Sequence, residues 1–166
     1  RNSNDSVQPL LIFSKSRGTS VNSDTIVQDG DIIGEIVWLG ADGNDRNSQV
    51  ASITALVDGT PGADDMPGAL TFRTTADGAA SASERMRIDS SGRVGIGVTD
   101  PTQYNSYGNG LVIEKSSTSG SSGISLISGT SGYGSIYFND GTGNNTVGRI
   151  EYYHGGDVMG FAIAGT

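Results

Sequence analysis

The feature that most constrains this chain is an internal repeat with a spacing of one hundred residues. Gly-Glu-Ile-Val-Trp at 34–38 returns in the same register as Gly-Ser-Ile-Tyr-Phe at 134–138. Weaker echoes link 11–16 with 111–116, 42–44 with 142–144, and 58–72 with a compressed 153–161. A repeat at a fixed period predicts one structural unit stacked along an axis, not an enzyme assembled around one cleft. Because the period is long for a solenoid, we expect two small β domains, 1–100 and 101–166.

The composition limits how large a core one chain can build. Only 34% of the 166 residues are hydrophobic, whereas glycine occupies 26 positions. Glycine contributes no side chain to a core and loses more backbone entropy on folding than any other residue. The apolar residues nevertheless cluster in short runs, which is not typical of a disordered chain. We therefore expect other chains to complete the core, because small domains gain buried area by oligomerisation.

The charge excludes several classes of partner. The net charge is −8, from 18 acidic and 10 basic residues. This balance disfavours nucleic acid, which requires a basic surface, and electrostatic docking on anionic lipid. No apolar run approaches the roughly 20 residues needed to cross a bilayer, so membrane insertion is not expected. The absence of cysteine excludes disulfides and thiolate metal sites.

Apolar and polar residues alternate along most of the chain. In residues 68–75, Leu70 and Phe72 are predicted to face inward, with Thr71 and Arg73 outward. Alternation of this kind predicts strands of sheets that are wetted on one side, and Gly-rich turns separate them. The class is therefore all-β, with antiparallel sheets. The predicted strands are 10–14, 32–39, 50–57, 68–75, 84–89, 93–96, 110–114, 123–128, 134–139, 147–153 and 157–164.

Two properties of these strands favour an intertwined fibrous homotrimer. Glycine weakens isolated strands, yet it recurs in 94–97 and 123–129. Close approach of several backbones around a three-fold axis would explain those glycines. Long strands with few charges also need their edges paired or covered, which closure around an axis provides.

The segment 84–97, Glu-Arg-Met-Arg-Ile-Asp-Ser-Ser-Gly-Arg-Val-Gly-Ile-Gly, resembles a signature of bacteriophage tail-fibre and tailspike stems. The upstream residues 58–62 and 66–75 resemble the same family, and the second repeat is similar to the same module but stops before an equivalent of 84–97. The resemblance implies a trimeric stem. In such proteins the motif often precedes an intramolecular chaperone of the endosialidase type, which trims itself off after trimer assembly.

Candidates for catalysis and metal binding have simpler explanations. His154 is the single histidine, beside two glycines, and is expected to be a surface turn residue. Residues 42–45 lack the spacing of a calcium loop, and a hairpin turn is favoured. Asp64 and Asp65 are adjacent on a Pro/Gly loop, where a solvated turn is favoured over a glycosidase pair. We expect no enzymatic activity, no catalytic residue, no metal site and no cofactor.

Binding is a better fit to the side chains available, because tyrosine combines a flat apolar face with a polar edge. Tyr153 falls on the outward side of its strand next to His154, and Tyr104 and Tyr107 lie in the segment between the repeats. These four residues are the candidate receptor-binding side chains. Trp38 aligns with Phe138 in the repeat and is predicted to be core. Arg85 and Arg87 are expected to pair with acids of a neighbouring strand or chain.

The function predicted from these features is a structural tail-fibre or tailspike segment, extracellular on a virion, that mediates host attachment. Its partners would be two further copies of the chain, other tail proteins of the virion, and a bacterial cell-surface glycan or outer-membrane protein. Three weak sites on one fibre would reinforce one another through avidity. Two alternatives are the stem of a polysaccharide-degrading tailspike whose catalytic domain lies outside this chain, and a bacterial surface adhesin.

Overall fold

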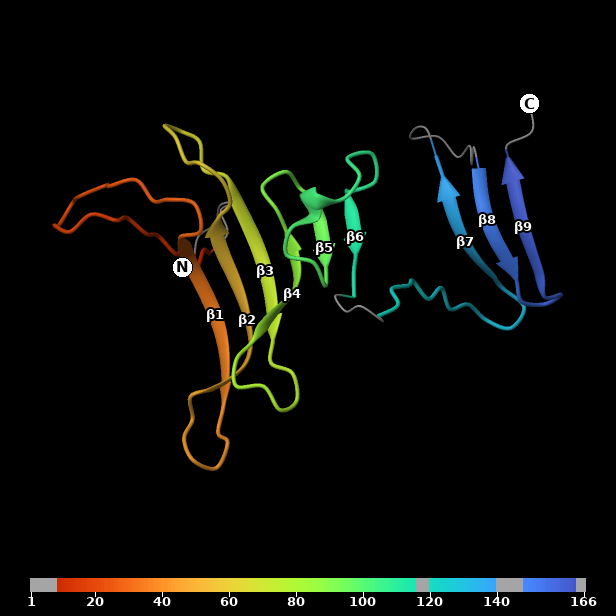
Figure 1. The fold of residues 1–166 in the computed structure, drawn as a ribbon, viewed down its shortest axis with the longest axis horizontal. Coiled ribbons are helices and arrows are strands. Elements are labelled where there is room, and N and C mark those ends of the chain that lie inside the picture. Colours follow the sequence, from red (N-terminus) through yellow and green to blue (C-terminus); the bar gives the residue numbers. More distant parts are fainter. Residues whose placement is uncertain (1–8, 116–119, 140–147, 164–166) are drawn as a thin grey trace. The chain divides into compact units, whose positions relative to one another are not determined.

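The computed structural model of this chain describes residues 9–115, 120–139 and 148–163. It forms two compact units, residues 1–122 and 123–166 (Figure 1). The first contains a six-stranded sheet and the second a three-stranded sheet. The predicted all-β class is confirmed. In the described part of the chain, no helix is long and apolar enough to span a membrane.

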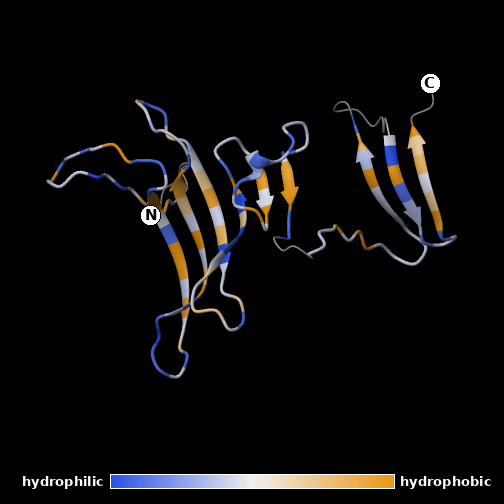
Figure 2. Cartoon of the chain, in the orientation of Figure 1, coloured by the Kyte–Doolittle hydropathy of each residue, from blue (hydrophilic) through white to orange (hydrophobic). Residues whose placement is uncertain are grey.

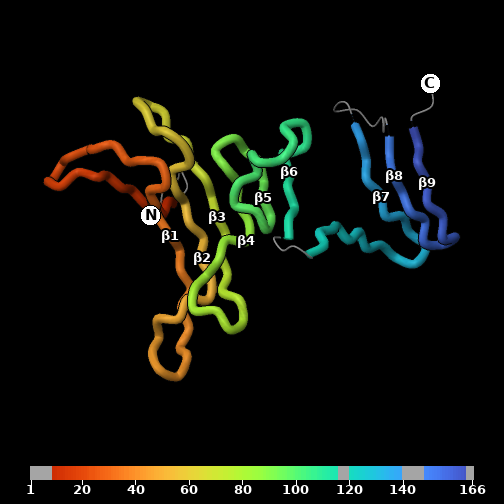
Figure 3. Tube along the Cα trace, viewed as in Figure 1, coloured from red at the N-terminus to blue at the C-terminus, as the bar shows by residue number. Residues whose placement is uncertain are grey.

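The first sheet has the strand order β1-β2-β3-β4-β5-β6, so each strand lies beside its neighbour in sequence. All pairs are antiparallel except β5 and β6, which are parallel. The residues between β5 and β6 must therefore cross from one end of the sheet to the other, and they include a short 3-10 helix, η1 (Pro101–Gln103) (Figure 3). The strands are β1 (Ile32–Gly40), β2 (Ser48–Val57), β3 (Gly68–Thr74), β4 (Ser83–Ile88), β5 (Val94–Ile96) and β6 (Leu111–Ile113).

The segment 84–97 forms β4, a tight turn and β5. The Asp89 carboxylate closes the turn by accepting hydrogen bonds from the backbone amides of Ser91 and Arg93, both at 2.9 Å, and from Arg93 Nε at 2.7 Å. Burial of Asp89 opposes its ionisation, but the hydrogen bonds from Arg93 and Ser91 win and lower its pKa. Gly92 occupies the left-handed position, with φ of 78°.

Close packing inside one chain explains the glycines at the end of this segment. A Cβ on Gly95 would lie 3.0 Å from a methyl of Val98 and 3.1 Å from the ring of Pro101. A Cβ on Gly97, which has φ of 76°, would meet the carbonyl oxygen of Glu114, the residue after β6. The close approach expected around a three-fold axis therefore occurs here between β5, β6 and their connection.

The second unit is a three-stranded antiparallel sheet that repeats the first three strands of unit 1. Its strands are β7 (Tyr133–Phe138), β8 (Gly148–Tyr153) and β9 (Val158–Ile163), in the order β7-β8-β9. Ile36, Ile53 and Phe72 lie opposite one another across β1, β2 and β3. Ile136, Ile150 and Phe161 form the same row across β7, β8 and β9. The repeat of 34–38 at 134–138, and of Phe72 at Phe161, thus holds in three dimensions.

The repeat breaks down before the first strand of each unit. Within the described residues, 10–14 and 123–128 are not strands, so both of those predictions were wrong. Their apolar residues nevertheless reach the equivalent strand. Phe13 lies directly over Gly34 of β1, and Leu126 lies against Gly134 of β7. The counterpart of 11–16 is therefore the segment around Leu126, not 111–116, because β6 occupies 111–113 and pairs with β5.

The side of the sheet buried within one chain is the reverse of the predicted one. Leu70 is 38% exposed, whereas Thr71 is 2% exposed. Thr54 is buried as well, and its hydroxyl donates to Glu35 Oε1 at 3.0 Å. Alternation of hydropathy is visible along the strands (Figure 2). The strand period was therefore predicted correctly, but alternation alone does not tell which face a single chain covers.

Residues 9–31 form an excursion ahead of β1 that is tied together at Asp31 (Figure 1). The Asp31 carboxylate accepts from Arg17 Nε at 2.6 Å, from the Gln28 amide at 2.9 Å and from Lys15 Nζ at 3.2 Å. The hydrogen bond from the Arg17 guanidinium is the main reason that the pKa of Asp31 lies well below its usual range.

We predict that Gly97→Ala destabilises the first unit more than Gly92→Ala does. Both glycines have φ near the same positive value, 76° and 78°, but a Cβ on Gly92 meets no atom within 4 Å. Gly92→Ala should cost about 1 kcal/mol for the left-handed backbone. Gly97→Ala should cost roughly 1–3 kcal/mol more because of overpacking. Urea unfolding at one protein concentration measures both, and equal costs would contradict the packing described for Gly97.

We predict that Asp31→Asn reduces the loss of stability at acidic pH. Because the folded-state pKa is lowered, the stabilisation is fully present above the unfolded Asp value of about 3.9 and is lost as the pH falls below it. Free energies of unfolding between pH 2 and 7 should show a smaller acid-induced drop in Asp31→Asn than in wild type. Asp77→Asn, in an exposed turn before β4, is the control. If the free energy of unfolding fell as much at acidic pH in Asp31→Asn as in wild type, the hydrogen bonds to the Asp31 carboxylate would not stabilise the fold.

Candidate functional site

The alternation of the strands places most of their large apolar side chains on one face of each sheet, with Val37, Leu56 and Val158 among the exceptions. We call these surfaces the apolar faces. Eleven large side chains on them are more than one third exposed. They are Ile36, Trp38, Leu70, Ile88, Ile96 and Leu111 in the first unit, and Ile136, Phe138, Met159, Phe161 and Ile163 in the second. Trp38, predicted to be core, is 49% exposed because no described element of its own chain covers this face at Trp38.

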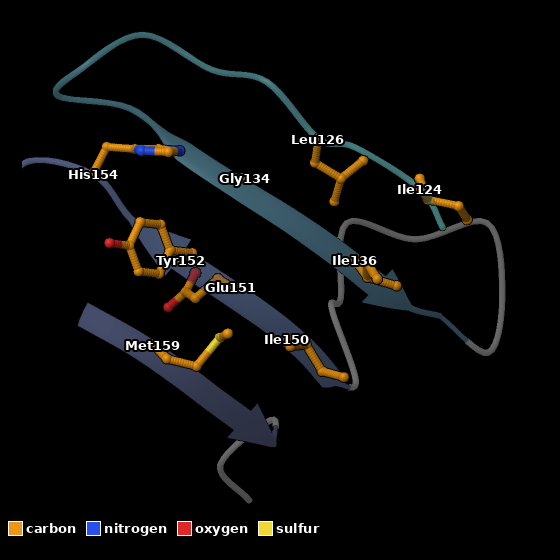
Figure 4. Close-up of a pocket in the computed structure, with 9 residues that line it drawn as sticks. All are labelled: Ile124, Leu126, Gly134, Ile136, Ile150, Glu151, Tyr152, His154 and Met159. Atoms are coloured by element: carbon orange, nitrogen blue, oxygen red, sulfur yellow. The ribbon is translucent and has the colours of Figure 1, made fainter. Parts of the chain in front are cut away.

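Each apolar face contains a bay beneath the segment that precedes its first strand. In the first unit the bay has a volume of about 170 Å³ and lies beside Phe13 and Gly34. In the second unit it has a volume of about 260 Å³ and lies beside Leu126 and Gly134 (Figure 4). Both are smaller than the roughly 300–1,000 Å³ of sites for small-molecule ligands. Their size suits single protruding side chains.

The two bays use equivalent positions of the repeat. Strand pairing places Gly34 opposite Ala55 and Ala55 opposite Leu70. It likewise places Gly134 opposite Tyr152, and Tyr152 opposite Met159. In both units the glycine of the first strand leaves room over the sheet, and the neighbouring strands supply the floor. The bays are thus a property of the repeated unit.

His154 lies on the same side as the second bay and helps to line it (Figure 4). Its ring meets the ring of Tyr152 edge-on, with the centroids 4.9 Å apart. The Tyr152 hydroxyl donates to Asp157 Oδ1 at 2.7 Å, and this hydrogen bond raises the pKa of Tyr152. The predicted turn around His154 is present, since residues 154–157 join β8 to β9.

Tyr153 projects from the opposite face of the second sheet, so the adjacent candidates Tyr153 and His154 do not form one site. The Tyr153 ring stacks on Tyr133, with the centroids 4.7 Å apart and the planes inclined by 25°. Strand pairing explains the contact, because Tyr133 and Tyr153 are directly opposite in β7 and β8. Tyr133 is therefore a further residue of this surface that was not among the predicted candidates, although alternation places it on the same side as Tyr137.

The same face carries an ion pair between the tyrosines. Arg149 Nε donates to Glu151 Oε2 at 2.7 Å, and the hydrogen bond raises the pKa of Arg149. Arg149 lies opposite Tyr137, which is 56% exposed. We call this surface the tyrosine face. It comprises Tyr133, Tyr137, Arg149, Glu151 and Tyr153.

The other two candidates lie in the first unit, between η1 and β6. Tyr104 is 39% exposed, and its hydrogen bond to Glu114 raises its pKa. Tyr107 is 99% exposed in a turn closed by the Asn105 side chain, whose Oδ1 accepts from the Tyr107 amide at 3.0 Å. These two tyrosines belong to the first unit, whereas Tyr153 and His154 belong to the second.

The carboxylates considered for chemistry take part in local structure. Asp42 accepts from the amides of Asn44 and Asp45 at 2.8 and 2.9 Å, and the hydrogen bonds lower its pKa. Asp65 pairs with Gly62 through backbone hydrogen bonds in a tight turn, with Asp64 at φ of 57°. Both segments are therefore turns. Across the ranges that the structure describes, no group of three or more potential ligands could hold a metal ion.

The two arginines of β4 have partners within the chain. Arg87 Nε lies 2.8 Å from Glu84 Oε1, an ion pair that is not aligned as a hydrogen bond, and Arg87 also approaches Asp58 at 4.0 Å. Burial raises the pKa of Glu84. Arg85 donates to the hydroxyl of Thr74 on the neighbouring strand at 3.1 Å. Arg87 thus pairs with an acid of its own strand and only approaches one in the turn after β2, and Arg85 bonds to a hydroxyl, so the predicted pairing with acids of a neighbouring strand is not what the single chain shows.

Comparison with solved structures identifies two similar folds, both from the L-shaped tail fibre of bacteriophage T5. One is its carboxy-terminal domain, with a TM-score of 0.55 and 11% identity over 92% of this chain and 74% of that one. The other is the same domain with its intramolecular chaperone domain, with a TM-score of 0.58 and 12% identity over 91% of this chain and 51% of that one. No protein-family model and no curated protein sequence matches. The chain therefore has the fold of these tail-fibre domains.

Proposed function

We propose that this chain is a structural segment of a bacteriophage tail fibre that assembles as a homotrimer and contributes to host attachment. Two independent lines support the proposal. The segment 84–97 resembles tail-fibre and tailspike stems, and the fold is that of T5 tail-fibre domains. In this role the protein is extracellular, on the virion, and contacts other tail proteins of the particle.

The exposed apolar faces are the observation that carries the proposal. Their eleven large side chains are each about half exposed, with values from 37% to 88%. At on the order of 150–200 Å² for a whole side chain of this size, they leave roughly 1,000 Å² of apolar area uncovered per chain. One partner in a stable interface of standard size contributes about 800 Å². The area is therefore enough for stable association.

A second copy of this chain is the partner that fits the apolar faces best. Across β1–β3 and β7–β9 the apolar faces carry no charged side chain among the paired residues. The uncharged surface matches another surface of the same kind and offers nothing to a charged partner. Cyclic symmetry lets identical faces cover one another and closes the assembly. Both units present the same face, so both contribute to the assembly.

The segments before β1 and β7 provide the side chains that such copies would exchange. Leu10, Leu11 and Ile12 are 65%, 77% and 73% exposed, and Ile127 is 94% exposed. Extended apolar residues without a strand partner in their own chain can pair with the edge of a sheet in another chain. In the trimer we assign these segments to the bays and sheet edges of neighbouring copies.

The trimer supports the attachment role because it presents three copies of each surface to the host cell. A bacterial cell-surface glycan or an outer-membrane protein is the receptor class, and three identical sites per fibre raise the avidity of a weak contact. The resemblance of 84–97 also assigns an intramolecular chaperone of the endosialidase type to the full-length protein, to guide trimer assembly. The enzymatic alternative is the stem of a polysaccharide-degrading tailspike whose catalytic domain lies outside this chain. That domain would need a pair of carboxylates flanking the glycosidic bond.

A pair of adjacent substitutions tests the trimer. Ile36 and Val37 are 43% and 42% exposed, but they lie on opposite faces of β1. We predict that Ile36→Glu abolishes the trimer, since three carboxylates would be buried without partners, and that Val37→Glu retains it. Light scattering should give about three times 17.0 kDa for wild type and Val37→Glu.

The same samples, heated briefly in detergent, test whether the trimer is intertwined. A heat-resistant trimer band is expected for wild type and Val37→Glu but not for Ile36→Glu. A wild-type mass of one chain, or equal loss of the trimer in both variants, would overturn the assembly proposed here.

A further inference from the structure

The two units share one fold, so a comparison of their equivalent faces separates the side chains that the fold requires from those that are free to serve a function. The apolar faces keep their chemistry in both units, with Ile36 replaced by Ile136 and Phe72 by Phe161 at equivalent positions. The opposite faces do not keep theirs. Tyr137 occurs where the first unit has Val37. A requirement of the shared fold would be present in both units, so the difference points to a task specific to the second.

The two faces differ in the same way across the next strand. Arg149 and Glu151 occupy the β8 positions that correspond to Ser52 and Thr54 of β2, since both sets neighbour the equivalent isoleucines Ile150 and Ile53. Ser52 and Thr54 are each 2% exposed. Arg149 and Glu151 have side chains that are 38% and 20% exposed. The second unit therefore presents polar groups to solvent where the first unit buries them.

The tyrosine face combines aromatic side chains with smaller ones on the neighbouring strand. Tyr133, Tyr137 and Tyr153 lie on β7 and β8. On β9 the same face carries Val158 opposite Tyr153, Gly160 opposite Glu151 and Ala162 opposite Arg149. A Cβ on Gly160 would lie 3.3 Å from Glu151 Cγ, so the glycine leaves space for the glutamate stem to lie over β9.

We propose that the tyrosine face binds neutral pyranose units of a polysaccharide. An exposed tyrosine ring packs against the C–H face of a sugar, and its hydroxyl bonds to the edge. Arg149 offers several donors and Glu151 offers acceptors, which together match vicinal hydroxyl groups. The inference rests on the proposed role in host attachment and names the receptor chemistry and the surface that recognises it.

Charge decides between neutral and acidic sugars. Arg149 is already compensated by Glu151 at 2.7 Å, so it has little net attraction for a second carboxylate. The chain carries a net charge of −8, which repels acidic polysaccharides over longer distances. The hydroxyl groups of a neutral sugar can form hydrogen bonds with Arg149 and Glu151 without separating the two charges. A neutral saccharide is therefore the ligand that suits the tyrosine face.

Saturation-transfer NMR on the full chain tests the inference. The probes are neutral oligosaccharides of glucose, mannose and galactose at millimolar concentration, with oligogalacturonate as the acidic comparator. We expect transfer to the ring C–H protons of at least one neutral probe, and a weaker signal or none for oligogalacturonate. Transfer to none of the neutral probes, or stronger transfer to oligogalacturonate, would overturn the assignment.

Substitutions locate the site once a neutral probe binds. Tyr137→Ala and Tyr153→Ala should weaken binding about tenfold, the effect of losing one aromatic contact. Tyr153→Phe keeps the ring and should stay within about threefold of wild type. Val37→Ala changes the equivalent position of the first unit, where the side chain is 42% exposed, and is the matched control. Equal weakening by Val37→Ala and Tyr137→Ala would exclude the tyrosine face.

The same samples separate this inference from the proposed assembly. Circular dichroism checks that each variant is folded, and light scattering gives its mass. A trimer that binds no neutral probe overturns the saccharide site alone, whereas a monomer that binds one overturns the assembly alone. If Tyr153→Ala unfolds the second unit, Tyr137→Ala still decides, because Tyr137 is 56% exposed and outside the Tyr133–Tyr153 stack.

Discussion

Strand pairing that places most large apolar side chains on one face of their sheet is the constraint on which the rest of this structure depends. The register from Ile36 through Ile53 to Phe72, and its copy in the second unit, leaves an uncharged surface that the described part of the chain covers only partly. Burial of apolar area is the main favourable term in folding, so a sheet with an open apolar face is energetically incomplete. The composition also indicates that one chain has few side chains with which to build a second layer over this face, since 26 of its residues are glycine.

The opposite faces show how one repeat supports two different surfaces. In the first unit this side is closed by hydroxyls and ion pairs, with Thr54 bonded to Glu35 and Arg87 paired with Glu84. In the second it carries stacked tyrosines and an accessible ion pair. Changes on this side leave the register and the apolar rows intact, since side chains of a strand alternate between faces. The repeated unit can therefore vary this face while the packing of its strands stays constant.

Sequence patterns predicted most of the strands, and specific residues explain the two that failed. The segments 10–14 and 123–128 have strand-like composition, but pairing requires a free sheet edge at the right place, which no local pattern encodes. The glycines at 95 and 97 fit close contacts with Val98, Pro101 and Glu114 of the same chain, which no local pattern encodes. Of the candidate binding residues, Tyr153 and His154 were adjacent in sequence but lie on opposite faces, and Tyr133 joined Tyr153 only through the register of β7 and β8.

The sequence by itself determined the all-β class, the turns and the equivalence of 34–38 with 134–138, because these depend on the alternation of neighbouring residues and on the backbone freedom of glycine. The tertiary structure decided the register, the parallel β5–β6 pair and which face a single chain buries. Those depend on contacts between residues far apart in the chain. Leu70 and Thr71 show the difference: the alternation predicted that they lie on opposite faces, but only the packed sheet determined that Thr71 is covered and Leu70 is left exposed for another surface.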